Sequence, residues 1–420
     1  MNHTYVSLYL VNAAMDNVYT ALSISLIAKR RLVVSCEDSC KAIPHFTAAV
    51  LKNCGLEPEE YTVVDLLQHQ TLEAIVDKST SVAKDGKRYF KQMIVWQNLQ
   101  RSSQELQKQL YQMILQIDHY EMNKAKYMDN PPASVHMGKS VVQIYKPEIF
   151  AIVPFLEYRL FDEAKLYIFL KEKFWQSVNF PNFDDASIPV SVSAGSTLGP
   201  DRYKPTILEL RAKMASVFIS PDIKGYIYSL IVFIRCHRMA SLAPKQVRVP
   251  TMTMDYVKDF CRAWILWKTH LLQKPTETEL ASAVDRSKTS APAKKATLTE
   301  FTTKTEQEED LFVTPEYVKL AVHKICYWLV DWQYNKKFAA TDDPDLDAKG
   351  KSEKEIKEEE KSIANKKLEI SMLTGDWYGS EYLFVNEYLK TQKMEKDYSS
   401  PTGFTNKIVD DCIRSVRPPL

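Results

Sequence analysis

One short segment has the spacing of a phosphate-binding loop but lacks most of its chemistry. Such a loop reads G-x-x-x-x-G-K-[ST] between a strand and a helix, and its glycines let backbone N–H groups approach phosphate. After the strand predicted at 32–34, the two glycine positions hold Ser35 and Cys40. Lys41 keeps the cation, but Ala42 stands where a hydroxyl would hold Mg²⁺. The spacing therefore predicts a phosphate-binding loop that has lost its glycines and its metal-binding hydroxyl.

The neighbouring residues also oppose phosphate and Mg²⁺. Glu37 and Asp38 place two negative charges inside the loop. A nucleotide site further uses a buried strand that ends in two acids, but the strand predicted at 93–96 ends in Gln97 and Asn98. An amide cannot act as a general base, and it binds Mg²⁺ poorly without a charge. These substitutions predict that the chain is not an enzyme and binds no cofactor.

The elements that must position these residues alternate between strand and helix. Strands are predicted at 32–34, 61–64, 93–96 and 149–153, and helices at 17–29, 41–53, 66–75 and 102–122. Ser102 with Glu105 three residues later forms a capping box for the last of these helices. Strands separated by helices predict a doubly wound parallel sheet, and we assign this α/β core to residues 1–204.

The second half of the chain has helical patterns and no strand signal. Helices are predicted at 206–217, 221–238, 253–272, 315–338, 352–372 and 380–396. Two of them begin alike, with Ser220-Pro221-Asp222 and Thr314-Pro315-Glu316 each supplying an N-cap, a proline and an acid. We predict an α-helical lid over residues 205–420, with polar insertions at about 273–309 and 340–366.

Composition excludes several classes of protein. Only ten of the 420 residues are glycine, and no two of them form G-x-G, which rules out a dinucleotide fingerprint and a kinase-type glycine loop. The net charge of +2 favours neither nucleic acid nor membrane as a partner. The longest apolar run, residues 226–234, is too short to span a bilayer. Seven cysteines without a secretory signal predict an intracellular protein of the cytoplasm or nucleus.

Two further groups of residues could bind ligands. Cys36 and Cys40 suggest a metal pair, but a structural zinc needs four ligands and no second Cys/His pair lies nearby, so we predict no metal site. The chain also has basic residues that could touch nucleic acid, although no aromatic residues interleave with them. These are Arg202, Lys204, Arg211, Lys213, Lys245 and Arg248.

The order of these features resembles the AAA+ ATPases of the magnesium-chelatase and MoxR type. The stretch from Asn98 to Leu106 matches the segment that follows their acid pair. Their fourth strand ends in a polar sensor, whereas the corresponding residues 153–155 carry no polar side chain. The resemblance implies that Lys173 stands at the arginine-finger position and that Lys245 is a remnant of a sensor arginine. It also relates residues 226–237 and 313–319 to the lid.

The chain also resembles the fungal maintenance of telomere capping protein 2 family. The shared elements are Phe218-Ile219 with Tyr226-Ile227, Lys173-Phe174-Trp175 and Tyr378-Gly379-Ser380. This resemblance implies a link to chromosome-end protection without an assigned chemistry.

These observations predict a catalytically inactive AAA+-like scaffold or regulatory subunit of a protein assembly, linked by resemblance to telomere capping and genome maintenance. Its partners would be other proteins, and no membrane is involved. Two alternatives stay open. One is a nucleotide-dependent AAA+ ATPase with an atypical pocket, and the other is a DNA-binding accessory protein.

Overall fold

A computed structural model describes most of the chain in segments. These are residues 2–84, 86–124, 132–137, 140–157, 166–180, 198–237, 249–272, 311–330 and 406–419. Side chains are described from Met15 onward, except those of residues 119–124 and 137. The helices predicted at 352–372 and 380–396 and both polar insertions lie outside the described residues.

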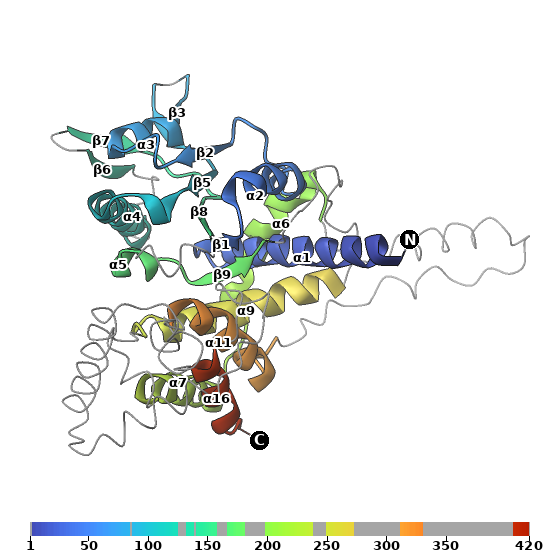
Figure 1. Cartoon of the computed structure of the whole chain (residues 1–420). Coiled ribbons are helices and arrows are strands. Elements are labelled where there is room, and N and C mark those ends of the chain that lie inside the picture. Colours follow the sequence, from blue (N-terminus) through green and yellow to red (C-terminus); the bar gives the residue numbers. More distant parts are fainter. Residues whose placement is uncertain are drawn as a thin grey trace, which may run out of the picture.

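A five-stranded parallel sheet forms the centre of the molecule (Figure 1). Its strands are β1 (Leu32–Cys36), β2 (Tyr61–Asp65), β5 (Met93–Gln97), β8 (Ala151–Glu157) and β9 (Gln176–Asn179), in the order β2-β5-β8-β1-β9. The predicted fold class, a parallel sheet wound with helices, is confirmed.

Strands β8 and β9 differ from the prediction. A proline usually marks the end of a strand, since it has no N–H to donate. Here β8 passes through Pro154 because Phe155 and Leu156 pair with Val34 and Ser35 of β1. Strand β9 was not predicted, since it is mostly polar. It is nevertheless buried, and its Gln176 Nε2 donates to Ser25 Oγ over 3.0 Å.

Helices from the first half of the chain pack around the sheet. They are α1 (Asn2–Ile27), α2 (Ser39–His45) with a π-helical continuation (Phe46–Leu51), α3 (Leu72–Ser79), α4 (Gln104–Lys124) and α5 (Ile168–Lys171). The helix predicted at 66–75 begins later, at Leu72. The reason is local: the Asp65 carboxylate accepts the Leu67 N–H at 3.0 Å in a turn, and Thr71 Oγ1 caps the helix by accepting the Ala74 N–H.

Two short hairpins, absent from the prediction, project from the sheet (Figure 1). One pairs β3 (Thr80–Val82) with β4 (Arg88–Phe90), and the other pairs β6 (Ala133–Met137) with β7 (Ser140–Ile144). The Phe90 N–H donates to the Tyr145 carbonyl at 2.9 Å, which ties the hairpins together. Strands β3 and β4, of three residues each, are too short for the period-2 alternation that identifies a strand in a sequence, and β6 and β7 are mixed in polarity without a long apolar run.

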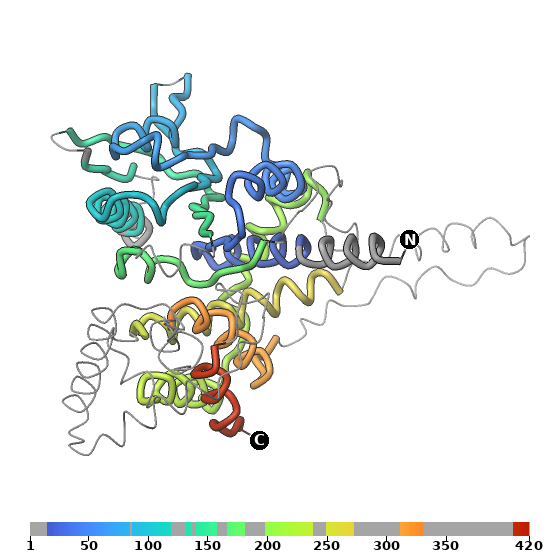
Figure 2. Tube along the Cα trace, viewed as in Figure 1, coloured from blue at the N-terminus to red at the C-terminus, as the bar shows by residue number. Residues whose placement is uncertain are grey.

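The later helices form a second body beside the sheet, with α1 running between the two (Figure 2). They are α7 (Pro221–Cys236), α9 (Thr253–Leu272), α11 (Pro315–Leu329) and α16 (Lys407–Ser415). Helix α6 (Pro200–Ala212) lies beside α2 instead, on the sheet's side of α1 (Figure 1). Ser220 caps α7 as predicted, whereas the Thr314 side chain makes no capping bond. The boundary between residues 204 and 205 stays a prediction. Among the described helices, none combines the length and apolarity that crossing a membrane requires.

Candidate functional site

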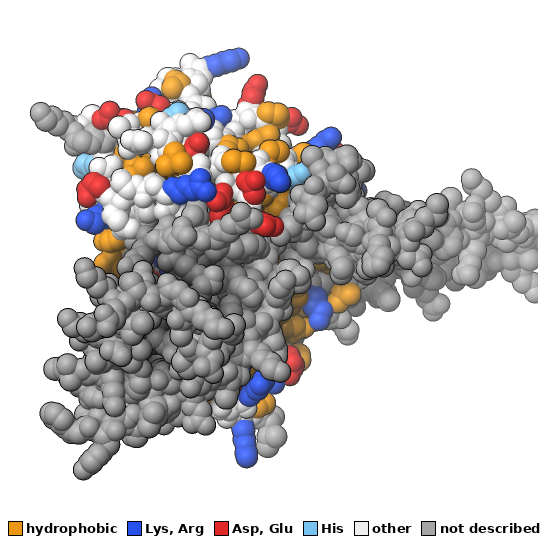
Figure 3. Space-filling view, viewed as in Figure 1, with side chains coloured by type: hydrophobic (Ala, Val, Ile, Leu, Met, Phe, Trp, Pro, Cys, Tyr) orange, Lys and Arg blue, Asp and Glu red, His pale blue; other side chains and the backbone are white. Residues whose placement is uncertain are grey.

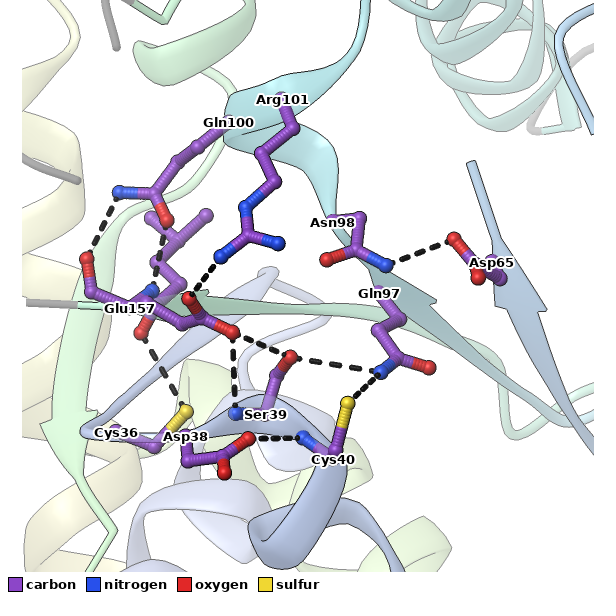
Figure 4. Close-up of polar contacts among 11 residues, drawn as sticks. Cys36, Asp38, Ser39, Cys40, Asp65, Gln97, Asn98, Gln100, Arg101 and Glu157 are labelled. Carbon is purple, nitrogen blue, oxygen red and sulfur yellow. Dashed lines mark hydrogen bonds and ion pairs between the residues drawn. The ribbon is translucent and has the colours of Figure 1, made fainter. Parts of the chain in front are cut away.

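The carboxyl edge of the sheet gathers polar side chains from three neighbouring strands. Parallel strands end at the same edge, so the ends of β1, β5 and β8 lie together, and open α/β sheets bind ligands there. Figure 4 shows the side chains that meet at this edge. Glu157, the last residue of β8, lies at the centre of the cluster.

The Glu157 carboxylate bonds to two other segments. Its Oε1 accepts the Ser39 backbone N–H at 3.3 Å and the Ser39 hydroxyl at 2.8 Å. Its Oε2 pairs with the Arg101 guanidinium at 3.0 Å. The Glu157 side chain is only 12% exposed, whereas that of Arg101 is 49% exposed. A carboxylate of the protein therefore occupies the position at which a bound anion could meet Ser39.

The turn after β5 aims Gln100 and Arg101 at β8. Asn98 adopts a left-handed conformation (φ 61°), which asparagine tolerates better than most residues, and the short 3₁₀ helix Leu99–Arg101 follows it. Gln100 then makes two hydrogen bonds to the backbone of Glu157. Its Oε1 accepts the Glu157 N–H at 2.7 Å, and its Nε2 donates to the Glu157 carbonyl at 3.2 Å. Both backbone and side chain of Glu157 are thus held.

The predicted loop is much shorter than a phosphate-binding loop. Ser35 lies within β1, which ends at Cys36, and α2 begins at Ser39, so only Glu37 and Asp38 separate strand from helix. The Asp38 carboxylate caps α2 by accepting the Cys40 N–H at 2.9 Å. A two-residue connection cannot wrap around a phosphate group, whichever side chains it carries.

The structure separates the predicted positions. Cys40 and Gln97 meet, because the Gln97 amide donates to Cys40 Sγ at 3.3 Å. Asn98 points toward β2 instead, and its Nδ2 donates to Asp65 Oδ1 at 2.8 Å (Figure 4). Lys41 is exposed and Ala42 is buried at the start of α2. The two amides at the acid-pair positions therefore stabilise different segments.

Glu157, Ser39, Gln100 and Arg101 were missed as site residues. The end of the fourth strand was predicted to lack a polar group, and this is wrong because β8 continues to Glu157. A usable signal was present: Glu157 is the first polar residue after an apolar run that starts at Ile149. If the predicted strand had been extended through Pro154 to the end of this apolar run, Glu157 would have been predicted at the edge of the sheet.

Lys173, the predicted arginine-finger position, lies before the amino end of β9 and bonds inward. Its Nζ is 3.5 Å from Asp118 Oδ2 and 5.8 Å from the centre of the Tyr111 ring. Asp118, on α4, also forms an ion pair with Arg31. Lys173 therefore helps Arg31 to neutralise a carboxylate between α4 and the sheet.

This pairing makes part of the stability depend on pH. Burial raises the pKa of Asp118, but the charge and hydrogen bonds of Arg31 and the charge of Lys173 lower it more, so the pKa lies below its ordinary value. The ion pairs of Asp118 therefore stabilise the folded protein fully above the pKa of about 3.9 that this carboxyl has in the unfolded chain. This stabilisation is lost as the pH falls through the pKa of Asp118 in the folded protein.

Asp118→Asn should therefore lower the free energy of unfolding at pH 7 by about 1–3 kcal/mol, because Arg31 loses its counter-charge in a largely buried position. Urea unfolding at pH 7, 5 and 3.5 measures this, and the difference from wild type should shrink at the lowest pH. Asp77→Asn is the control, since Asp77 is 62% exposed beside Arg88 and should have little effect. A difference that is constant with pH would contradict the assignment.

Three of the basic residues considered for nucleic-acid binding make contacts within the chain, whereas Arg202 is exposed at the start of α6. Lys204 pairs with Glu60 at 2.7 Å, and Lys213 pairs with Glu209 at 2.8 Å. Arg211 donates to the Leu26 carbonyl. On the face seen in Figure 3, the described basic and acidic side chains are interspersed. Lys245 and Arg248 lie outside the described residues.

Cys36 and Cys40 point in different directions. The buried Cys36 thiol donates to the Leu156 carbonyl at 3.6 Å, and burial raises its pKa. Cys40 is exposed beside Gln97. Within the described part of the chain, no group of three or more His, Cys, Asp or Glu side chains is placed to hold a metal ion.

Comparisons with known proteins give structural matches. No family profile and no curated protein match the chain. It is similar to the crystal structure of a "putative ATPase" from Cytophaga hutchinsonii, at 12% identity and a TM-score of 0.43, over 84% of this chain and 91% of that one. It is also similar to a full-length MCM homolog from Methanopyrus kandleri, at 10% identity and a TM-score of 0.34. That match covers 60% of this chain and about half (49%) of the homolog.

The prediction that the chain is not an enzyme is contradicted by these matches. One of the matched structures is described as a "putative ATPase". Substitutions at motif positions do not by themselves show that activity is absent. The resemblance to the fungal telomere-capping family finds no support in the comparisons. The parallel five-stranded sheet and the helical region that follows it give this chain an α/β fold, which is consistent with the AAA+-like arrangement that the sequence resembles.

Proposed function

We propose that the chain acts through contacts with other proteins, as a scaffold or regulatory subunit of an assembly. One observation carries this proposal: the polar groups around Glu157, at the carboxyl edge of the sheet, satisfy one another. Ser39 and Arg101 bond to Glu157, and Asp38 caps α2. Such an edge keeps its shape without a small-molecule ligand, as a constant surface for protein contacts requires. This role does not require that ATP turnover is absent.

The resemblance to the telomere-capping family leads us to propose genome maintenance as the process in which this assembly acts. It rests on short elements, and two of them are structural in this chain. Phe174 and Trp175 are buried in the core, and Ile219, Tyr226 and Ile227 are buried around the start of α7. Similar buried residues indicate a similar core rather than a shared partner.

Nucleotide titration tests the proposal. ATP with Mg²⁺ should leave the melting temperature of the full chain unchanged, because a ligand stabilises only a state that it binds. Capture of the tagged chain from cells, followed by cross-linking and mass spectrometry, should recover protein partners in defined proportion. Saturable ATP binding together with an absence of such partners would reject the scaffold role.

A nucleotide-dependent ATPase with an atypical pocket is the second candidate. Arg101 and Lys41 favour it, since both are exposed cations at the edge where open α/β sheets bind ligands. Phosphate release that falls when Arg101 is replaced by alanine, and not when the distant Lys213 is replaced, would establish this candidate. No phosphate release above a buffer blank would reject it.

A further inference from the structure

Glu157 connects three segments that a bound ligand would otherwise have to hold together. They are the start of α2 at Ser39, the turn at Gln100 and Arg101, and the end of β8 itself (Figure 4). We propose that Glu157 is a built-in substitute for a bound anion, which fixes these segments in one arrangement whether or not an external ligand is present. This inference rests on the proposed function, because it explains how the edge stays constant.

The groups around the carboxylate require an anion. The Ser39 N–H and hydroxyl both donate to Glu157, and the Arg101 guanidinium has donors and no acceptor. A buried donor without an acceptor costs free energy, and charged acceptors make the stronger bonds. An apolar side chain at position 157 would leave these donors unsatisfied, and a neutral amide would leave Arg101 without its counter-charge.

The backbone of Glu157 is held by contacts that do not involve its own carboxylate. Gln100 holds its backbone N–H and carbonyl, and the neighbouring Leu156 carbonyl accepts the Cys36 thiol. An anion on a fixed strand end loses little entropy when it bonds to Ser39, whereas a free anion must lose its translational freedom. The internal carboxylate therefore competes well against anions in solution.

The bonds of Glu157 to Arg101 and to Ser39 should contribute unequally to the stability of this arrangement. Arg101 is about half exposed, and exposed ion pairs contribute little because water and salt screen them. The Ser39 bonds lie on the buried side of a carboxylate that is 12% exposed. Glu157→Gln keeps an oxygen that can accept from Ser39 but removes the charge, so its effect should be smaller than that of Glu157→Ala.

Hydrogen exchange of the full chain, followed by mass spectrometry, tests the inference. In Glu157→Ala, the backbone amides of residues 39–40 and 99–102 should exchange about tenfold faster than in wild type, while α7 is unchanged. Glu157→Gln should show a smaller increase. Glu59→Ala is the matched control, because Glu59 is an exposed carboxylate outside the cluster, and it should leave both segments at the wild-type rate.

Chemical rescue shows whether the missing group is an anion. Sodium acetate should slow exchange at residues 39–40 in Glu157→Ala, with no effect on wild type, whereas sodium chloride at the same ionic strength should not slow it.

Wild-type exchange rates in both segments of Glu157→Ala would overturn the inference. If that variant unfolds as a whole, wild-type rates in Glu157→Gln together with no loss of melting temperature overturn it instead. Saturable ATP binding by wild type together with an absence of protein partners would reject the scaffold role, and these exchange rates would still measure the Glu157 contact.

Discussion

Trp175→Ala should lower the free energy of unfolding by about 3–5 kcal/mol, the usual cost of removing a large buried aromatic side chain. Trp175 is fully buried immediately before β9, and its ring lies 5.7 Å from that of Phe260 on α9. Its indole N–H donates to Ser25 Oγ on α1 at 3.1 Å. The substitution would leave a cavity between α1, α9 and the sheet.

The residues before Trp175 accept hydrogen bonds from α9 and α11, so a cavity at Trp175 would weaken the contacts of several helices with the sheet. The Glu172 carbonyl accepts the Tyr256 hydroxyl of α9 at 3.0 Å. The Phe174 carbonyl accepts the Trp328 indole N–H of α11 at 2.8 Å. This segment therefore joins the sheet to helices from both halves of the chain.

Urea unfolding at pH 7, followed by circular dichroism, measures the effect. Trp175→Phe is the matched variant: it keeps most of the ring packing and loses only the N–H, so it should cost about 1–2 kcal/mol. A loss below about 1 kcal/mol for Trp175→Ala would show that the site collapses around the missing ring and that the segment is not a structural anchor.

Gly55→Ala should lower the free energy of unfolding by about 3 kcal/mol or more, because two effects add. Gly55 has a left-handed backbone (φ +65°), which costs free energy for any residue with a Cβ atom. An added Cβ would also lie 2.2 Å from the carbonyl oxygen of Pro200. That oxygen belongs to the first residue of α6, so the clash is with backbone and cannot be relieved by a rotamer change.

Two other glycines separate these effects in the same unfolding assay. Gly86 has φ +76° with no heavy atom within 4 Å of an added Cβ, so Gly86→Ala should cost only the backbone strain, about 1 kcal/mol. Gly225 lies in α7 with open space around it, and Gly225→Ala should stabilise by about 0.5–1 kcal/mol. Equal losses for Gly55→Ala and Gly86→Ala would show that the approach to Pro200 is unimportant.

Local patterns in the sequence were sufficient for the fold class. Short apolar runs alternating with helical periodicity predicted four of the five sheet strands, and Ser220-Pro221-Asp222 predicted the start of α7. These features depend on neighbours within a few residues. Strand β9 and the two hairpins were missed because polar or short segments become strands only when a partner strand pairs with them.

The sequence alone also determined that the loop after β1 lacks the glycines and hydroxyl of a phosphate-binding loop, since residue identity decides that. Only the tertiary structure decided what replaces them. Glu157 is 118 residues from Ser39 in the chain, and Lys173 is 55 residues from the carboxylate it neutralises. No local pattern relates such residues. Because the strands are parallel, Glu157 of β8 and Ser39 after β1 lie at one edge of the sheet. The two-residue loop leaves hydrogen-bond donors at that edge, and the carboxylate from the neighbouring strand accepts from them.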